Sequence, residues 1–194
     1  MLFRSKEIYE WVKLAKGDVP DHPFHGNQYT GSMGSNAAAF SSIGGTVRIA
    51  SPSERSQIRN EVISMGEKMP TDWHEDTGVV LTIAALDEGP NVLVARDASG
   101  AIAGALSFDD NNVKDWGNAV YISFLGTTGI TNGAGSALAR EATRWAANSD
   151  KFVLGSPTEK STPFWKKMGW HYDPNDTGED AWGLTAEEAK AAAR

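Results

Sequence analysis

Two glycines stand at the start of a predicted helix, in the stretch TNGAGSALAREATRWA (131–146). The first turn of a helix has backbone N–H groups without intrahelical partners, and the helix dipole favours an anion there. Gly133 and Gly135 have no side chains that would keep a phosphate group away from these donors. The stretch is therefore a candidate phosphate-binding loop, although Gly-x-Gly alone is a weak signal and the glycines could simply form a tight turn.

The loop differs from two well-known phosphate-binding patterns. It is not a Walker loop, because no Lys-Ser/Thr pair follows the glycines. It is not a full Gly-x-Gly-x-x-Gly fingerprint, because Leu138 stands at the position of the third glycine. Its significance therefore depends on the elements around it.

These elements are two predicted strands. Residues 119–126 (AVYISFLG) are apolar almost throughout, which is typical of a central strand, and residues 151–156 (KFVLGS) form the next strand. A strand–turn–helix–strand unit crosses over with a right hand and lays its two strands side by side and parallel. The sequence thus predicts an α/β fold with the glycine loop between two parallel strands.

Other elements follow from periodicity and turn signals. Further strands are expected at 46–50, in a hairpin over 91–108, and in a closing hairpin over 169–184. Further helices are expected from 52 to about 68, over 162–169, and from 185, with capping boxes at Ser51/Glu54 and Thr185/Glu188. Residues 71–90 are ambiguous, because 79–86 (VVLTIAAL) could be a strand or a buried helix.

The first part of the chain has a different character. Residues 2–16 place apolar side chains among charges at helical spacing, which predicts an amphipathic helix that must lie against something. Residues 17–45 are rich in Gly, Ser, Asn and Pro and predict an irregular linker. We therefore expect residues 1–45 to form a docking arm, 46–184 the main domain, and 185–194 a peripheral C-terminal helix.

Composition limits the function classes. The chain has 194 residues, 22% of them charged, and a net charge of −7, which argues against nucleic-acid binding. No apolar run is long enough to cross a bilayer, so no membrane association is expected. The absence of cysteine rules out disulfides and thiolate metal sites and fits a reducing, cytoplasmic compartment.

The stretch DHPFHGNQYTG (21–31) allows three interpretations. Asp21, His22 and His25 could belong to a metal site, but no fourth ligand is evident, so no metal is expected. The aromatic residues of the stretch could instead anchor an irregular loop. The segment also resembles a His-Pro-Phe-x-Gly-Asn-Gln-Tyr/Trp stretch of bacteriophage proteins, including predicted head-associated ones, which implies docking to a phage structural protein through residues 1–45.

Three segments together carry a stronger resemblance: NGAGSALAREATRWA (132–146), KFVLGSP (151–157) and PFWKKMGW (163–170). In residue type and spacing they resemble the acyl-CoA-binding half of the GNAT superfamily of N-acyltransferases, well over 91–173 and plausibly from 46. The resemblance implies a mixed, twisted sheet with a central parallel strand pair flanked by helices. It also implies that acyl-CoA, in the first place acetyl-CoA, is a cosubstrate whose acyl group passes to a primary amine.

The resemblance also assigns cofactor-binding residues. It implies that the pyrophosphate binds N–H groups of the loop residues Asn132, Gly133, Ala134, Gly135 and Ser136. It implies that main-chain groups of Leu125, Gly126 and Thr127 bind the pantetheine, beside a gap where the two parallel strands diverge. Such pairing is physically reasonable, because the pantetheine amides can bond along an exposed backbone like an extra strand.

Two positions depart from the family pattern. Ile130 stands where the family often has Gln or Arg, so a charged contact with the phosphate is missing. Trp165, which we expect to face the core, stands where many members have a tyrosine that protonates the leaving thiolate. An indole N–H can donate a hydrogen bond but is not a practical acid at neutral pH.

The catalytic residues are harder to assign. Ser156, at the carboxyl end of its strand, is the candidate, because its hydroxyl could face the thiolate, although it could equally begin a turn. Asp109 and Asp110 are possible bases, but paired surface aspartates more often form turns. Tyr121 is expected in the core or in the wall of a substrate pocket.

Three functions are therefore compatible with the sequence. The first is an N-acetyltransferase with an unidentified amine acceptor. The second is a catalytically degenerate GNAT-fold structural protein, such as a bacteriophage virion component that decorates the head or capsid, and the third is a CoA-binding sensor. Trp165, Ile130 and the arm favour the second, whereas the intact glycine loop favours the first, because a domain without a ligand does not need it.

Overall fold

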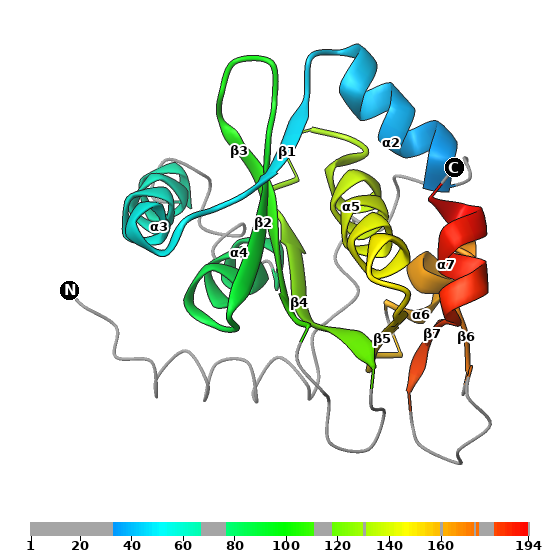
Figure 1. Ribbon diagram of the computed structural model, residues 1–194. Helices are drawn as coiled ribbons and strands as arrows, with labels where there is room; N and C mark the ends of the chain where they lie inside the picture. Colours follow the sequence, from blue (N-terminus) through cyan, green and yellow to red (C-terminus); the bar gives the residue numbers. More distant parts are fainter. Residues whose placement is uncertain are drawn as a thin grey trace.

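A seven-stranded mixed sheet runs through the computed structural model, with the strands in the order β1-β2-β3-β4-β5-β7-β6 (Figure 1). The structure describes residues 33–66, 77–110, 118–129, 131–159, 161–172, 174 and 181–193. The strands are β1 (Thr46–Ile49), β2 (Asn91–Arg96), β3 (Ile102–Asp109), β4 (Ala119–Thr127), β5 (Phe152–Gly155), β6 (His171–Tyr172) and β7 (Trp182–Leu184). All of the strands expected from the sequence are present.

The pair at the centre of this sheet is parallel. β4 and β5 run in the same direction, and every other neighbouring pair is antiparallel. The crossover between them passes through α5 (Ala134–Asn148), as the strand–turn–helix–strand order predicts. The expected mixed sheet with a central parallel pair is confirmed.

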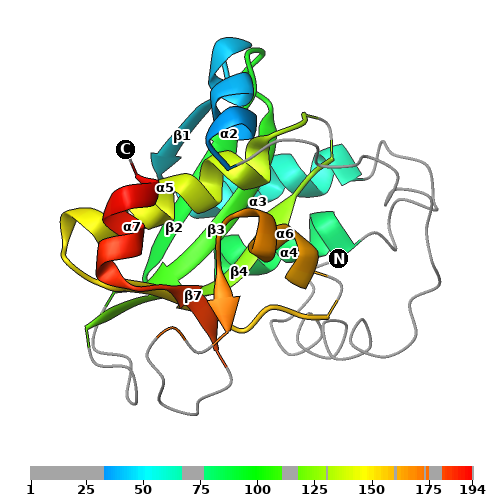
Figure 2. The same cartoon turned by 90° about the vertical axis from the view of Figure 1, so that its right-hand side faces the viewer.

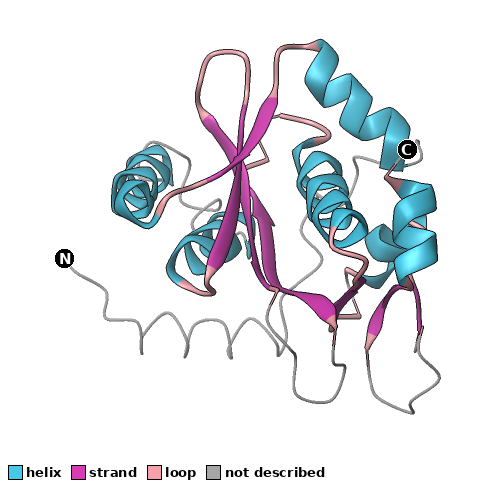
Figure 3. Cartoon of the chain, viewed as in Figure 1, coloured by secondary structure: helices cyan, strands magenta, loops and turns pink. Residues whose placement is uncertain are grey.

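Helices flank both faces of the sheet (Figure 3). One face is covered by α3 (Pro52–Gly66) and α4 (Thr77–Asp87). The other is covered by α5, and α2 (Met33–Ser42), α6 (Thr162–Lys167) and α7 (Ala186–Ala192) lie on the same side (Figure 2). Each face has its own core, which includes Leu106, Val120 and Leu138 under α5 and Ile58, Val62 and Leu86 under α3 and α4.

The ambiguous stretch 79–86 is helical, as part of α4. α4 packs closely on β4 at Gly126, where an added Cβ would lie 2.3 Å from the backbone nitrogen of Thr82. Thr82 is 0% exposed, so even a polar residue of this helix is buried. The helix therefore lacks a continuous polar face, which explains why its periodicity is uninformative.

The prediction of an irregular linker over 17–45 is wrong for residues 33–42, because these residues form the helix α2. This helix packs on the core through Ala37 and Phe40, which are 3% and 0% exposed. After Met33 at its first position, Phe40 is the one large apolar residue of the helix, so a buried face made of it and Ala37 produces no apolar periodicity that could stand out among Gly, Ser and Asn. α2 ends before Gly44, which has a φ of 85°.

Residues 1–32 lie outside the described residues, and with them the amphipathic helix expected at 2–16 and the residues Asp21, His22 and His25. Within the described ranges, no group of three or more His, Cys, Asp and Glu side chains is placed to hold a metal ion. The described helices include none that combines the length and the apolar character needed to span a bilayer.

The expected helix caps are largely present. α7 has the full capping box, in which Thr185 and Glu188 bond each other's backbone N–H groups. At the start of α3, Glu54 accepts from the Ser51 N–H (2.9 Å) and the Ser51 hydroxyl (2.7 Å). Glu54 also pairs with Arg48 at 2.6 Å, and these hydrogen bonds, first that from Arg48, lower the pKa of Glu54 to about 2.

This lowered pKa predicts a pH-dependent contribution to stability. The pKa of Glu54 in the folded protein lies below its ordinary value of 4.5, so its bonds stabilise the fold above about pH 4.5 and are lost as the pH falls through about 2. We expect Glu54→Gln to lower the thermal midpoint slightly at neutral pH, because the group is exposed. Thermal unfolding at a series of pH values should show the difference from wild type vanish in strong acid, and a constant difference would contradict the assignment.

Candidate functional site

β4 and β5 pair over only part of their length. The pairing runs from Ala119 opposite Phe152 to Ile122 opposite Gly155, where β5 ends. β4 continues to Thr127, paired with β3 on its other side. Along 123–127 β4 therefore has no parallel neighbour in the described part of the chain, and backbone groups that do not bond β3 face this opening.

A β-bulge sets which side chains face α5 in this region. Ser107 and Phe108 of β3 lie opposite Phe124 and Ile122, so Ser123 is an extra residue in β4. Beyond the bulge Leu125 packs on the core under α5, whereas Phe124 packs on the core under α3 and α4. The bulge therefore turns Leu125 toward α5 and leaves the side of Gly126 free for α4.

Hydrogen bonds hold the loop before α5 against the β2–β3 hairpin. The Thr128 N–H and hydroxyl donate to the carbonyl oxygens of Ala103 (3.0 Å) and Ile102 (2.9 Å). The Thr131 hydroxyl donates to Asp97 at 3.4 Å. The pKa of Asp97 is lowered, chiefly by the hydroxyl of Ser99. The start of α5 is thus fixed at the open end of the gap between β4 and β5.

The first turn of α5 carries several donors without partners. Gly133 is the N-cap and has a φ of 87°, a conformation that favours glycine. No described residue accepts a hydrogen bond from the backbone N–H of Ala134, Gly135 or Ser136. The Ser136 hydroxyl is also unpartnered, although the residue is only 1% exposed. An anion with several oxygens suits this arrangement, because buried donors without acceptors cost free energy.

The two glycines of the loop differ in what the fold requires. Gly133 is explained by its positive φ. Gly135 has no positive φ, and a Cβ there would lie 3.4 Å from Thr127, 3.7 Å from Leu125 and 3.8 Å from Phe164, which are ordinary contact distances. Neither backbone strain nor contact with the protein therefore requires glycine at position 135. The close approach of a ligand would explain why a residue without a side chain stands there.

Hydroxyl groups meet at the closed end of the gap. The Tyr121 hydroxyl donates to Ser156 Oγ at 3.0 Å, between β4 and the residue that follows β5. Tyr121 lies opposite Asp109 of β3, so the side chains of these two residues share a face of the sheet. Sequence reasoning missed the Tyr121–Ser156 pair, because only the register of the parallel strands brings the two residues together.

Trp165 lies in the core, as expected. It is 7% exposed, and its ring lies 4.2 Å from that of Trp170, which is 3% exposed. Phe164 contacts Trp165 edge to face and is the member of the aromatic pair that approaches Gly135. Trp165 is therefore packed against aromatic rings. Ile130 lies outside the described residues.

Asp110 has a structural role. Its two carboxylate oxygens accept hydrogen bonds from Asn91 Nδ2 and Trp145 Nε1, both at 3.1 Å, and its carbonyl accepts one from Lys151. These contacts join the end of β3 to β2 and α5. Asp110 thus has a structural role, and Asp109 is the aspartate that lies opposite Tyr121.

No protein-family model matches the chain, and no curated protein matches it. Solved structures do match. That of AtaTR bound with AcCoA has 10% identity and a TM-score of 0.52, and the match covers 76% of this chain and 96% of that chain. The Escherichia coli GNAT family N-acetyltransferase YhbS in complex with CoA has 16% identity, coverage of 75% and 84%, and a TM-score of 0.49.

A third structure, from Pyrococcus horikoshii and described as an acetyltransferase, has 14% identity and a TM-score of 0.44. The match covers 67% of this chain and 44% of that longer one. At such identities a likeness shows the fold alone. The sheet order, the parallel pair and the AtaTR likeness together confirm the expected fold, a mixed sheet with a central parallel strand pair flanked by helices.

Proposed function

We propose that the protein is an N-acyltransferase that moves an acyl group, in the first place acetyl, from acyl-CoA to a primary amine. The observation that carries the proposal is the first turn of α5, whose unpartnered donors lie at the open end of the gap between β4 and β5. Support also comes from the AtaTR structure, which shares the fold and is bound with AcCoA.

The residues present fit an acyl-CoA. Asn132 to Ser136 would bind the pyrophosphate through N–H groups, and the Ser136 hydroxyl would gain the acceptor that it lacks. Leu125, Gly126 and Thr127 would bind the pantetheine amides along the unpaired edge of β4. A chain bound in this direction would bring its thioester toward the closed end of the gap, where Tyr121 and Ser156 meet.

The reaction needs a donor for the leaving thiolate. Attack of a neutral amine on the thioester carbonyl gives a tetrahedral intermediate, whose collapse breaks the carbon–sulfur bond and leaves the electron pair on sulfur. The proton that the amine nitrogen loses would pass to solvent water and the thiolate would take one up, so the products are the amide and the free thiol. Ser156 would donate its hydroxyl hydrogen toward that sulfur, while its oxygen accepts from Tyr121 and is thereby polarised. This pair would supply the donor that Trp165, buried among aromatic rings, does not.

Ser156→Ala is expected to lower kcat by about 100-fold with little change in the KM for acyl-CoA, because the lost donor acts on the leaving group. Tyr121→Phe should lower kcat less, by about 10-fold, and the double variant should be no worse than Ser156→Ala, since the two hydroxyls act as a unit. Steady-state kinetics measures all three. Ser42→Ala, which removes an exposed hydroxyl of α2, is the control. Unchanged kcat in Ser156→Ala would remove Ser156 from the reaction and leave the proposed activity standing.

Release of free thiol from acetyl-CoA, measured with a panel of amines, tests the proposed function. Steady turnover with at least one amine supports it. Calorimetric binding of CoA without turnover of any amine would indicate a sensor, and absence of both would refute the cofactor assignment.

Burial of Trp165 favours one alternative, a structural protein that keeps the fold and has lost the chemistry. In that case residues 1–32 would dock the domain to a partner, such as a bacteriophage head protein. Removing residues 1–32 should then abolish association with that partner while CoA turnover stays absent. For the enzyme we propose the cytoplasm as the site of action.

A further inference from the structure

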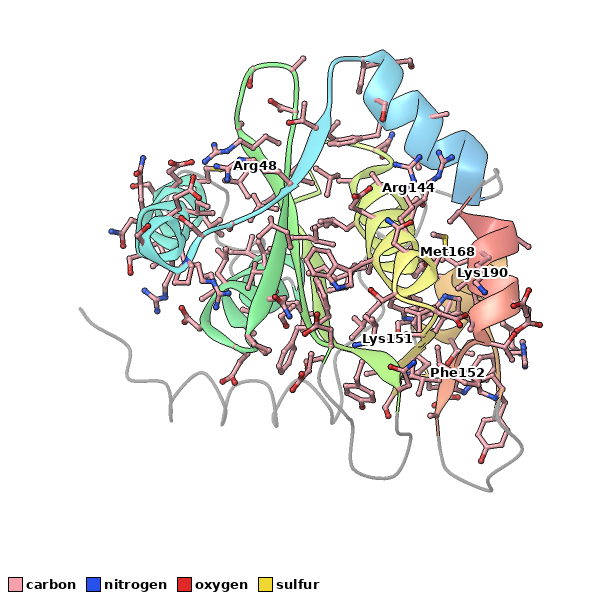
Figure 4. All side chains as sticks on the ribbon, viewed as in Figure 1. Arg48, Arg144, Lys151, Phe152, Met168 and Lys190 are labelled. Carbon is pink, nitrogen blue, oxygen red and sulfur yellow. The ribbon has the colours of Figure 1, made fainter. Side chains whose placement is uncertain are left out.

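A cavity lies on the side of α5 opposite Gly135. It has a volume of about 280 Å³ and is lined by residues of α2, the start of β1, and α5. The α5 residues in its wall are Ala137, Arg140, Glu141 and Arg144. Figure 4 shows Arg144 in the space between α5 and α2.

This cavity is separate from the candidate acyl-CoA site. Ala137, Glu141 and Arg144 follow one another at intervals of four and three residues and therefore form one stripe of the helix. Leu138 and Ala142 point to the core under α5, and Gly135 faces β4 and α6. The two sites thus lie on opposite sides of the same helix.

Arg140 stands out among the arginines. Its Nε atom is buried and has no hydrogen-bond partner, as is also true of Arg55 Nε, but the terminal nitrogens of Arg55 donate to the carbonyl oxygens of Gly89 and Pro90. The other arginines in the described part of the chain, namely Arg48, Arg55, Arg59, Arg96 and Arg144, all bond a carboxylate or a carbonyl oxygen. Arg140 therefore has a buried Nε–H donor without an acceptor, which costs free energy unless a ligand supplies one.

The charge of the wall is also unbalanced. Arg144 is already paired with Glu141 at 3.2 Å, so the positive charge of Arg140 remains uncompensated within the cavity. A planar guanidinium binds carboxylate and phosphate oxygens in pairs. The cavity is smaller than most sites for drug-sized ligands, so its ligand would be small.

We propose that this cavity binds the oxyanion group of a small molecule, a phosphate or a carboxylate, through Arg140. The oxygens of the ligand accept hydrogen bonds from the guanidinium, and the charge of Arg140 is neutralised. The site is independent of the proposed acyltransferase activity.

Nuclear magnetic resonance of the full chain tests the proposal. The Nε–H signal of Arg140, identified by its absence in Arg140→Gln, should shift and saturate as inorganic phosphate or succinate is added at constant ionic strength. The Nε–H signals of the paired Arg59 and Arg96 should stay in place. Saturation by phosphate alone, succinate alone or both would each support the site and tell the two sources apart. An unmoved Arg140 signal, or shifts confined to the amides of 133–136, would overturn it.

Calorimetry supplies a second readout. Arg140→Gln should weaken binding of the active probe at least tenfold. Arg59→Gln, which removes an arginine of α3 paired with Asp87 on the other side of the sheet, should bind as wild type does. Equal affinity in wild type and Arg140→Gln would contradict the proposal, whatever the affinity of the control.

Discussion

Replacing Gly135 by aspartate is expected to abolish CoA binding while the protein stays folded. The new Cβ would meet Thr127, Leu125 and Phe164 at ordinary distances, and the carboxylate would lie at the start of α5, where the helix dipole favours it. The same carboxylate would repel a pyrophosphate and occupy the donors that it needs. We expect affinity to fall by about 100-fold or more, which corresponds to ~3 kcal/mol.

Calorimetric titration with CoA measures this loss, and thermal unfolding establishes that the variant is folded. Gly135→Ala is the matched control, because it adds the Cβ without the charge. It should bind CoA more weakly than wild type, because the Cβ limits close approach of the ligand, but more tightly than Gly135→Asp. Gly135→Asp with wild-type affinity would remove the loop from the cofactor site, and with it the proposed chemistry. A parallel loss in both variants would assign the effect to space rather than charge.

The part of the fold that surrounds this loop could be predicted from the sequence because its signals are local. Gly133, the apolar strand at 119–126 and the following helical pattern lie within thirty residues and point to one crossover unit. The cap at Thr185 and Glu188 is equally local and is present. Such features depend on neighbours in the chain, which composition and spacing reveal.

Other features depend on contacts between distant segments. The bulge at Ser123 leaves no mark on composition, yet it decides whether Leu125 or Gly126 faces α5. The Tyr121–Ser156 bond needs the register of β4 and β5, which single-sequence patterns do not contain. The sequence analysis did not predict α2, because the buried residues of this helix are Ala37 and Phe40 and give no apolar periodicity. Sequence reasoning therefore located the cofactor loop better than the groups that would act on the substrate.

Removal of residues 1–45 is expected to unfold the protein at room temperature, whereas removal of residues 1–32 should leave it folded. α2 belongs to the core under α5, and the ring of Phe40 packs so closely on Gly45 that a Cβ there would lie 2.5 Å from it. Loss of a buried phenylalanine side chain alone costs about 3–5 kcal/mol. A domain is typically stable by about 5–15 kcal/mol, so loss of the whole helix would exhaust most of that margin.

Urea unfolding of both truncated chains, followed by circular dichroism, measures the difference. Phe40→Ala in the full chain is the companion variant and should lower the free energy of unfolding by about 3–5 kcal/mol. Ser42→Ala, at an exposed position of the same helix, should change it by less than ~0.5 kcal/mol. If the chain that begins at residue 46 unfolds at the same urea concentration as the chain that begins at residue 33, α2 is dispensable. The domain then begins at residue 46. The opposite result would place α2 in the domain and limit any docking arm to residues 1–32.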